Sequence, residues 1–244
     1  HPFPVVAWFD RVVALSFAYP EEALRPLVPN GLEIDTYEGL GFVTAALVWT
    51  RRLRPAGFPE ALGQDSFFVG YRIFTRLNDG GRRLRGLRIL RSETDKKHMV
   101  IFGNLMTGYQ YRHVNVAIKE ANGITRVTTA LSNGAQTLDT TFCHRDEAPG
   151  LPEGSPFPDW RTARRFAGPM PFTFSQQEDG SFIVIEGNRE TWTPRPIRVD
   201  EWKIAMFEDS PLKEYTPRLA NAFMMENVDY RWKKGWIVRP GGEP

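Results

Sequence analysis

Short strand-like segments, separated by turn residues, recur along almost the whole chain. They are about 8 to 12 residues long and rich in β-branched and aromatic side chains, a composition typical of strands. Pairs such as Asn122-Gly123, Asn133-Gly134 and Asp179-Gly180 lie between them and tolerate positive φ in tight hairpins. Consecutive hairpins predict a mainly antiparallel sheet. Strands are expected at 11–19, 31–37, 41–50, 66–77, 84–91, 98–105, 112–120, 124–132, 135–144, 171–176, 181–193, 197–207 and 221–232.

The number of expected strands favours a closed or nearly closed β-barrel, because closure protects strand edges. A chain of 244 residues fits one domain, so we expect a single mainly β domain over residues 1 to 244. Two short helices are expected, at 19–28 and 159–166, where proline, acidic residues or an aspartate occupy the helix start. The loop 146–158, rich in proline and glycine, is expected to cross a barrel mouth.

Charge and cysteine content exclude several classes of function. The net charge is only +2, and no nucleic-acid-binding motif accompanies the arginine runs, so we expect no nucleic-acid partner. The single Cys143 excludes an internal disulfide and fits a cytoplasmic setting. No apolar run approaches the length of a membrane span, which predicts a soluble protein without a membrane partner. Because the chain begins at His1, a removed leader stays open.

No cofactor is expected. The histidines His1, His98, His113 and His144 lack metal-ligand spacing, so no metal site is predicted. Neither a glycine-rich phosphate loop nor a nucleophile elbow is present.

Three stretches together resemble one known family. They are FAYPEEALRPLVPNGLEIDTYEG (17–39), GNLMTGYQY (103–111) and SPLKEYTPRLANAFMMENVDY (210–230). In order and spacing they resemble proteins related to acetoacetate decarboxylase, and most closely the uncharacterised bacterial branch of that superfamily. The resemblance implies a cone-shaped, mostly antiparallel β-barrel with a few short helices, a central pocket and a homo-oligomer.

The resemblance also implies where a catalytic lysine would lie. The decarboxylase uses one of two adjacent lysines to form an imine with its keto acid. Alignment through Gly103 and Tyr109 puts Tyr111 and Arg112 at those positions, and neither side chain forms an imine. The doublet Lys96-Lys97 falls earlier, where we expect an exposed turn.

Two further positions follow from the resemblance. The family places an arginine near the first strand, where it receives the substrate carboxylate, and Arg11 lies one place out of register with it. The family also has a glutamate before the strand matched by 66–77, where this chain has Gln64-Asp65-Ser66. Asp65 takes the place of this glutamate only if the alignment moves by one residue.

Strand alternation gives independent candidates, because successive side chains face opposite sides of a sheet. Arg112 shares its column with Val114 and Val116, and Glu226 shares its column with Met224 and Val228, so both are expected to point inward. They form either a structural ion pair or the anion-binding and proton-transferring parts of a pocket. Other polar residues in mixed columns, which could line a pocket, are Arg72, Glu186 and Glu190.

Two functions follow from these candidates. The first is a lyase-type enzyme that acts on a small organic acid or keto compound by acid–base chemistry, without a lysine imine. Arg112 would hold the anion, Tyr111 or Tyr109 would donate a proton or hydrogen bond, and Glu226 would be the base, with Tyr109, Arg11 and Glu190 binding substrate. The second is a non-catalytic ligand-binding barrel that kept the pocket and lost the nucleophile.

Overall fold

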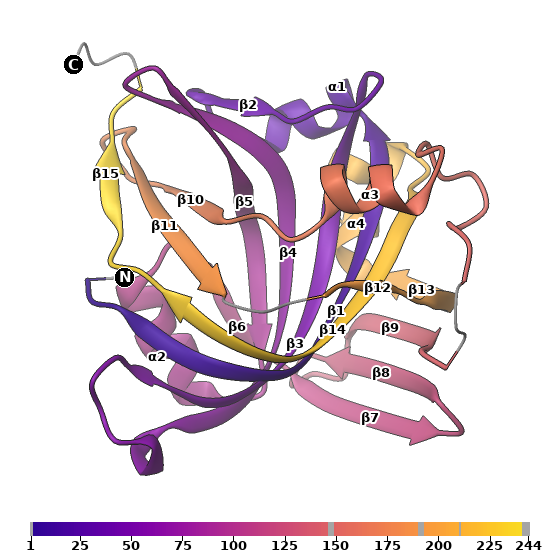
Figure 1. The fold of residues 1–244 in the computed structure, drawn as a ribbon, viewed down its shortest axis with the longest axis horizontal. Helices are drawn as coiled ribbons and strands as arrows, with labels where there is room; N and C mark the ends of the chain where they lie inside the picture. The colour runs from indigo at the N-terminus through magenta and orange to yellow at the C-terminus, as the bar shows by residue number, and fades with distance from the viewer. Residues whose placement is uncertain (1, 146–148, 190–192, 210, 241–244) are drawn as a thin grey trace.

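Long, mostly antiparallel strands form a closed ring in the computed structural model, which describes residues 2–145, 149–189, 193–209 and 211–240. Pairing runs from β14 through β1, β3, β4, β5 and β10 to β11, and β11 pairs with β14 again (Figure 1). All of these pairings are antiparallel except that of β5 with β10. The ring strands are β1 (Val5–Pro20), β3 (Leu40–Pro55), β4 (Gln64–Asp79), β5 (Arg82–Thr94), β10 (Phe172–Gln176), β11 (Phe182–Arg189) and β14 (Arg218–Trp232).

Short strands extend this sheet at its margins. They are β2 (Leu32–Ile34), β6 (Tyr111–His113), β12 (Arg195–Pro196) and β15 (Trp236–Val238). The predicted class, mainly β with a few short helices, is confirmed. No helix within the described ranges is long and apolar enough to cross a membrane.

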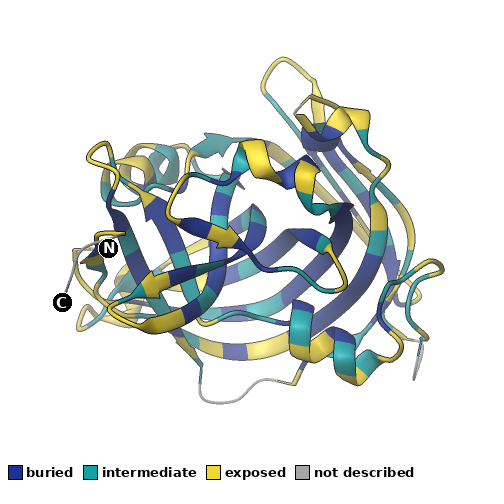
Figure 2. Cartoon of the chain, turned by 90° about the horizontal axis from the view of Figure 1, so that it is seen from above, coloured by how far each residue is buried: buried dark blue, intermediate teal, exposed yellow. Residues whose placement is uncertain are grey.

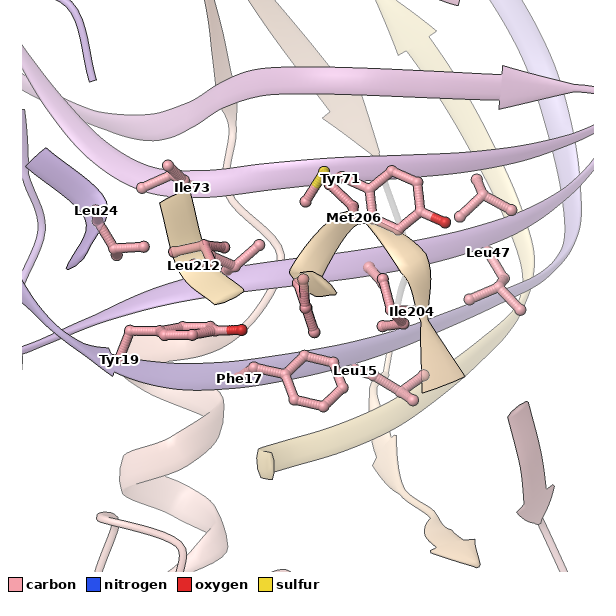
Figure 3. Packing of buried hydrophobic residues seen from close by; sticks show 14 of the residues in the cluster. Leu15, Phe17, Tyr19, Leu24, Leu47, Tyr71, Ile73, Ile204, Met206 and Leu212 are labelled. Atoms are coloured by element: carbon pink, nitrogen blue, oxygen red, sulfur yellow. The ribbon is translucent and has the colours of Figure 1, made fainter. Parts of the chain in front are cut away.

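A second, four-stranded sheet packs against the outside of the ring. Its strands are β7 (Asn115–Ala121), β8 (Ile124–Ala130), β9 (Gln136–Cys143) and β13 (Arg198–Ile204). The main core lies between this layer and β1, β3 and β4, together with α4 (Ala205–Asp209) and the 3-10 helix η3 (Pro211–Glu214). In Figure 3, Leu15, Phe17 and Tyr19 of β1 lie beside Ile204, Met206 and Leu212.

Strand β1 is buried on both of its faces. Leu15 and Phe17 face the outer core, whereas Val12 and Ala14 face the inside of the ring. Two covered faces explain the nearly continuous apolar run of this strand. Seen from above, buried residues follow the central strands, and exposed residues gather in the loops and helices (Figure 2).

Both predicted helices are present. The first consists of α1 (Glu21–Leu24) and the 3-10 helix η1 (Arg25–Leu27). The second is α3 (Trp160–Ala167), whose N-cap Asp159 accepts a 2.7 Å hydrogen bond from the Thr162 amide. A further 3-10 helix, η2 (Glu60–Leu62), precedes β4.

The strand predicted at 98–105 is wrong, because this segment forms helix α2 (Lys97–Met106). A short apolar run fits a buried strand and a helix equally well. Its helical spacing is visible in the side chains that face the inside of the ring, namely His98, Met99, Phe102, Gly103 and Met106.

Candidate functional site

A cavity of about 490 Å³ occupies the inside of the ring. Its walls come from the inward faces of β1, β3, β4, β5 and β14 and are mostly aliphatic and aromatic. This volume lies in the range usual for small-molecule sites. The end of α3 and the three residues after it, 167 to 170, close one end of the cavity beside Phe74 and Leu87, and α2 covers part of the other end.

Arg72 brings a positive charge into this apolar wall from β4. Strand alternation places it with Phe68 and Phe74, as the sequence pattern predicts, and all three line the cavity. Its Nε is buried and has no hydrogen-bond partner among the described residues. A guanidinium in apolar surroundings is unfavourable unless an anion pairs with it. Arg72 is therefore suited to bind a carboxylate.

Glycine at position 70 makes room for that guanidinium. A Cβ on Gly70 would lie 2.8 Å from Nε and 2.8 Å from Nη2 of Arg72. Any larger residue would push the guanidinium away from the strand.

Three tyrosines share the cavity with Arg72, namely Tyr109, Tyr111 and Tyr230. Burial raises the pKa of Tyr111 to about 12, an effect that the nearby Arg72 charge opposes. Burial also raises the pKa of Tyr109 and of Tyr230. At neutral pH these phenols therefore stay protonated and donate hydrogen bonds.

The backbone holds Tyr111 firmly in place at the start of β6. Its amide donates a 2.6 Å hydrogen bond to Asn104 Oδ1, and its carbonyl accepts one of 2.9 Å from Asn104 Nδ2. The ring packs on α2 at Gly103, where a Cβ would lie 2.5 Å from the ring. Tyr109 is held by its hydroxyl, which is 2.7 Å from Thr173 Oγ1.

A second arginine, Arg189 at the end of β11, also lines the cavity. Its Nη2 donates a 3.0 Å hydrogen bond to the Pro169 carbonyl. Burial lowers the pKa of Arg189, and a hydrogen bond with Tyr230 opposes that effect. Arg189 thus ties the closed end of the cavity to β14.

His98, on the first turn of α2, is the only imidazole among the described lining residues. Its Nε2 is buried without a hydrogen-bond partner in the described part of the chain. Imidazole is the side chain that most often transfers protons near neutral pH. His98 can therefore serve as an acid–base group.

Arg112 and Glu226 do not meet, so both predicted arrangements, a structural ion pair and two parts of a pocket, are wrong. Arg112 Nε donates a 3.0 Å hydrogen bond to Glu93 Oε1, in the layer between the ring and the second sheet. Glu93 is fully buried, and its Oε2 also accepts hydrogen bonds from Thr129 (3.3 Å) and Thr137 (2.9 Å). Alternation placed Arg112 on an inward-facing column but could not tell that this face meets a second sheet.

Glu226 lies at the surface, so its predicted inward orientation is also wrong. It pairs with Arg195 at 3.1 Å and with Arg11 at 3.6 Å. The next residue, Asn227, has a φ of 56° and interrupts the pairing of β14 with β1. The side chains of β14 that face the cavity change phase at this residue, so Met225 and Val228 both line it.

Arg11 also lies outside the cavity. Its Nη1 is 2.9 Å from Glu120 Oε2, and its guanidinium lies over Trp49, 5.6 Å from the ring centroid. Asp65 is exposed and accepts a 3.0 Å hydrogen bond from the Arg52 amide. Glu190, the remaining predicted binding residue, lies outside the described residues.

The lysines of the chain, all within the described ranges, lie away from the cavity wall. Lys96 Nζ is 3.0 Å from Asp95 Oδ2 at the start of α2, and Lys97 is exposed. Of the two positions that the resemblance assigns to catalytic lysines, only Tyr111 lines the cavity.

The family DUF2071, described as an uncharacterized conserved protein, matches residues 7–229. The chain belongs to this family. A search of curated proteins finds no match to this DUF2071 chain.

Solved structures share the fold of this DUF2071 protein at low sequence identity. An acetoacetate decarboxylase-like enzyme from Sphingomonas wittichii RW1 matches with a TM-score of 0.66 and 10% identity, over 98% of this chain and 94% of that chain. The enduracididine biosynthesis enzyme MppR, complexed with pyruvate, gives 0.64 and 9%, over 99% and 93%. Acetoacetate decarboxylase from Legionella pneumophila gives 0.62 and 12%, over 97% and 88%. The predicted acetoacetate decarboxylase-like fold is confirmed.

Several cavity residues of this DUF2071 protein were absent from the predicted site. Arg72 carried a sequence signal, since it is a charged residue in a column with Phe68 and Phe74. His98 also carried a sequence signal, which is the helical spacing of the cavity-facing residues around it. Interpreting 98–105 as a strand conceals that spacing. Tyr230 shares the column with Val228 that alternation places inward, but nothing in the pattern marked its phenol as part of a site. Arg189 ends β11, and no sequence pattern marked it.

Proposed function

We propose that this DUF2071 protein is a lyase-type enzyme that acts on a carboxylate or keto compound by acid–base chemistry, without a lysine imine. The observation that carries the proposal is Arg72, whose buried Nε has no partner among the described residues and faces a largely apolar cavity. A carboxylate there would gain a charge-assisted hydrogen bond in surroundings where water competes little.

The chain supplies groups for proton transfer next to a carbonyl. With its carboxylate on Arg72, a keto acid would lose a carbon-bound proton to His98 Nε2. The electron pair of that C–H bond would move onto the carbonyl oxygen, giving an enolate. The Tyr111 hydroxyl, which stays protonated because burial raises its pKa to about 12, would donate a hydrogen bond to this oxygen. Return of the proton from His98 to the carbon completes the exchange. In the lyase reaction the electron pair of the enolate would instead expel a substituent from the neighbouring carbon, and His98 would give the proton to that leaving group.

The fold relatives support the choice of ligand class. MppR is solved in complex with pyruvate, a keto acid, and the other two structures are a decarboxylase and a decarboxylase-like enzyme. The lining of this cavity supports the absence of an imine, because Tyr111 occupies the wall and every lysine lies elsewhere.

A non-catalytic ligand-binding barrel is the second candidate. It is favoured by one observation: among the described residues that line the cavity, none is an aspartate or glutamate. Proton transfer would then depend on His98 alone. Under either function, a homo-oligomer and a cytoplasmic location stay predictions.

Hydrogen–deuterium exchange separates the two candidates. Incubation with pyruvate or 2-oxooctanoate in D₂O, followed by proton NMR, should show loss of the carbon-bound protons next to the keto group. His98→Gln and Tyr111→Phe should each slow this exchange by on the order of 100-fold. Binding without exchange would support the ligand-binding barrel. A lysine adduct trapped by borohydride would contradict the proposal.

A further inference from the structure

We infer that the ligand of this cavity is an elongated amphipathic carboxylate, with its charge on Arg72 and an apolar tail that reaches the cavity mouth. The inference rests on the proposed function, because it assumes that Arg72 binds the carboxylate. It adds the size and polarity of the rest of the ligand.

The position of Arg72 along β4 shows how deep the charge lies. Gln64, the first residue of the strand, is exposed and lines the mouth. Arg72 lies eight residues further, but its guanidinium lies over Gly70. The six residues from Gln64 to Gly70, at about 3.3 Å each, place the charge roughly 20 Å along the curved strand. A carboxylate bound at Arg72 therefore leaves a long part of the cavity between itself and the mouth.

The walls of that part are mainly apolar. Strand β1 contributes Val5, Phe9 and Val12, and β3 contributes Val48 and Leu53. Phe9 stacks on Tyr230 with ring centroids 4.8 Å apart, so the aromatic wall is continuous from β1 to β14. Such walls bind a hydrocarbon tail better than they bind water.

The volume also exceeds the needs of a short keto acid. A cavity of about 490 Å³ holds on the order of sixteen waters at about 30 Å³ each. A molecule the size of pyruvate would displace only a few of them. The remaining waters would lie against side chains that offer them few hydrogen bonds, which favours a longer ligand.

Apolar side chains at the mouth mark the path of the tail. Phe3, Leu62 and Phe102 line the cavity and yet are 36%, 61% and 54% exposed. They come from the N-terminal segment, η2 and α2, so three separate parts of the chain converge on the rim. A tail that reaches the rim would cover these side chains.

Calorimetric titration with butanoate, octanoate and dodecanoate tests the inference on the full chain. Affinity should rise about threefold to fourfold per methylene, which is on the order of 100-fold from butanoate to octanoate. Octanol, which has the same tail without the charge, should bind far more weakly. Arg72→Gln should remove the affinity for all three acids.

Variants along the proposed path locate the tail. Val48 lies opposite Phe68 on the neighbouring strand. Val48→Trp should narrow the cavity, so it should weaken the binding of octanoate and leave the binding of butanoate unchanged. Phe102→Ser should weaken the binding of dodecanoate severalfold. Ile101→Ser is its matched control, because Ile101 is 68% exposed on the same helix and does not line the cavity. If Val48→Trp does not fold, the Phe102 and Ile101 pair still tests the path.

The outcomes are distinguishable. Equal affinity for all chain lengths, lost on Arg72→Gln, would overturn the elongated ligand and leave the proposed carboxylate site intact. If no carboxylate binds, both the elongated ligand and the proposed carboxylate site are overturned. Length-dependent affinity that survives Arg72→Gln would overturn the placement of the charge.

Discussion

The guanidinium of Arg72 lies directly over Gly70, and a Cβ on Gly70 would lie only 2.8 Å from Arg72 Nε. The two residues are separated by one position on β4 and face the same cavity. The absence of a side chain at position 70 therefore sets where the positive charge lies.

Gly70→Ala should move the Arg72 guanidinium and weaken carboxylate binding by about tenfold to a hundredfold, since small displacements of a positioned group are costly. Calorimetric titration with octanoate measures the change. Gly150→Ala is the control, because no other part of the protein lies within 4 Å of a Cβ added at Gly150. This variant should bind octanoate with unchanged affinity. Unchanged affinity in Gly70→Ala would show that the position of Arg72 does not matter.

Arg72→Gln should abolish carboxylate binding and yet stabilise the ligand-free protein. The free energy of unfolding is expected to rise by about 1 kcal/mol, because the substitution removes from an apolar wall a charge that has no ion-pair partner among the described residues. Urea unfolding measures it. Arg83→Gln, which breaks a surface pair with Glu33, should change it by less than about 1 kcal/mol. Destabilisation by Arg72→Gln would mean that the guanidinium has a structural partner.

Glu93→Gln should destabilise the protein by about 2 kcal/mol, since it leaves the partly buried Arg112 without its counter-ion. Glu226→Gln removes a surface carboxylate and should cost less than about 1 kcal/mol. Urea unfolding of both variants makes the comparison. Neither residue lines the cavity, so hydrogen–deuterium exchange of the keto acid should survive Glu226→Gln at full rate. Loss of exchange in Glu226→Gln would restore it as the base.

Alkaline pH should destabilise the fold through Tyr111. Its pKa is about 12 in the folded chain against an ordinary value of 10.0, so the unfolded chain loses this proton first as pH rises. The contribution to stability is therefore complete below about pH 10 and is lost between about pH 10 and 12. Urea midpoints measured across this range should fall, and Tyr111→Phe should make the fall shallower. A flat profile would contradict the burial of the phenol.

The sequence predicted the fold better than the site. Hairpin turns and strand-like segments lead directly to an antiparallel, mainly β chain, and the N-cap pattern at Asp159 leads to α3. These signals are local, so they predict secondary structure without knowledge of how the sheets pack. Alternation likewise placed Arg72 with Phe68 and Phe74, because β4 keeps its phase from Phe68 to Phe74.

The errors came from features that alternation cannot express. At Asn227, which has a φ of 56°, the cavity-facing side chains of β14 change phase, and Glu226 lies at the surface. Arg112 is on a covered face, but a second sheet covers it, and its partner Glu93 comes from β5. The segment 98–105 is too short for its apolar pattern to separate helix from strand, which concealed His98.

The most direct test of a carboxylate site in a cavity without lysine is a crystal structure of the full chain with 2-oxooctanoate. We expect the carboxylate within hydrogen-bond distance of the Arg72 guanidinium, the keto oxygen facing the Tyr111 hydroxyl, and the tail pointing toward Phe102. A carboxylate bound at Arg112, or a covalent bond from the keto carbon to a lysine, would contradict this placement.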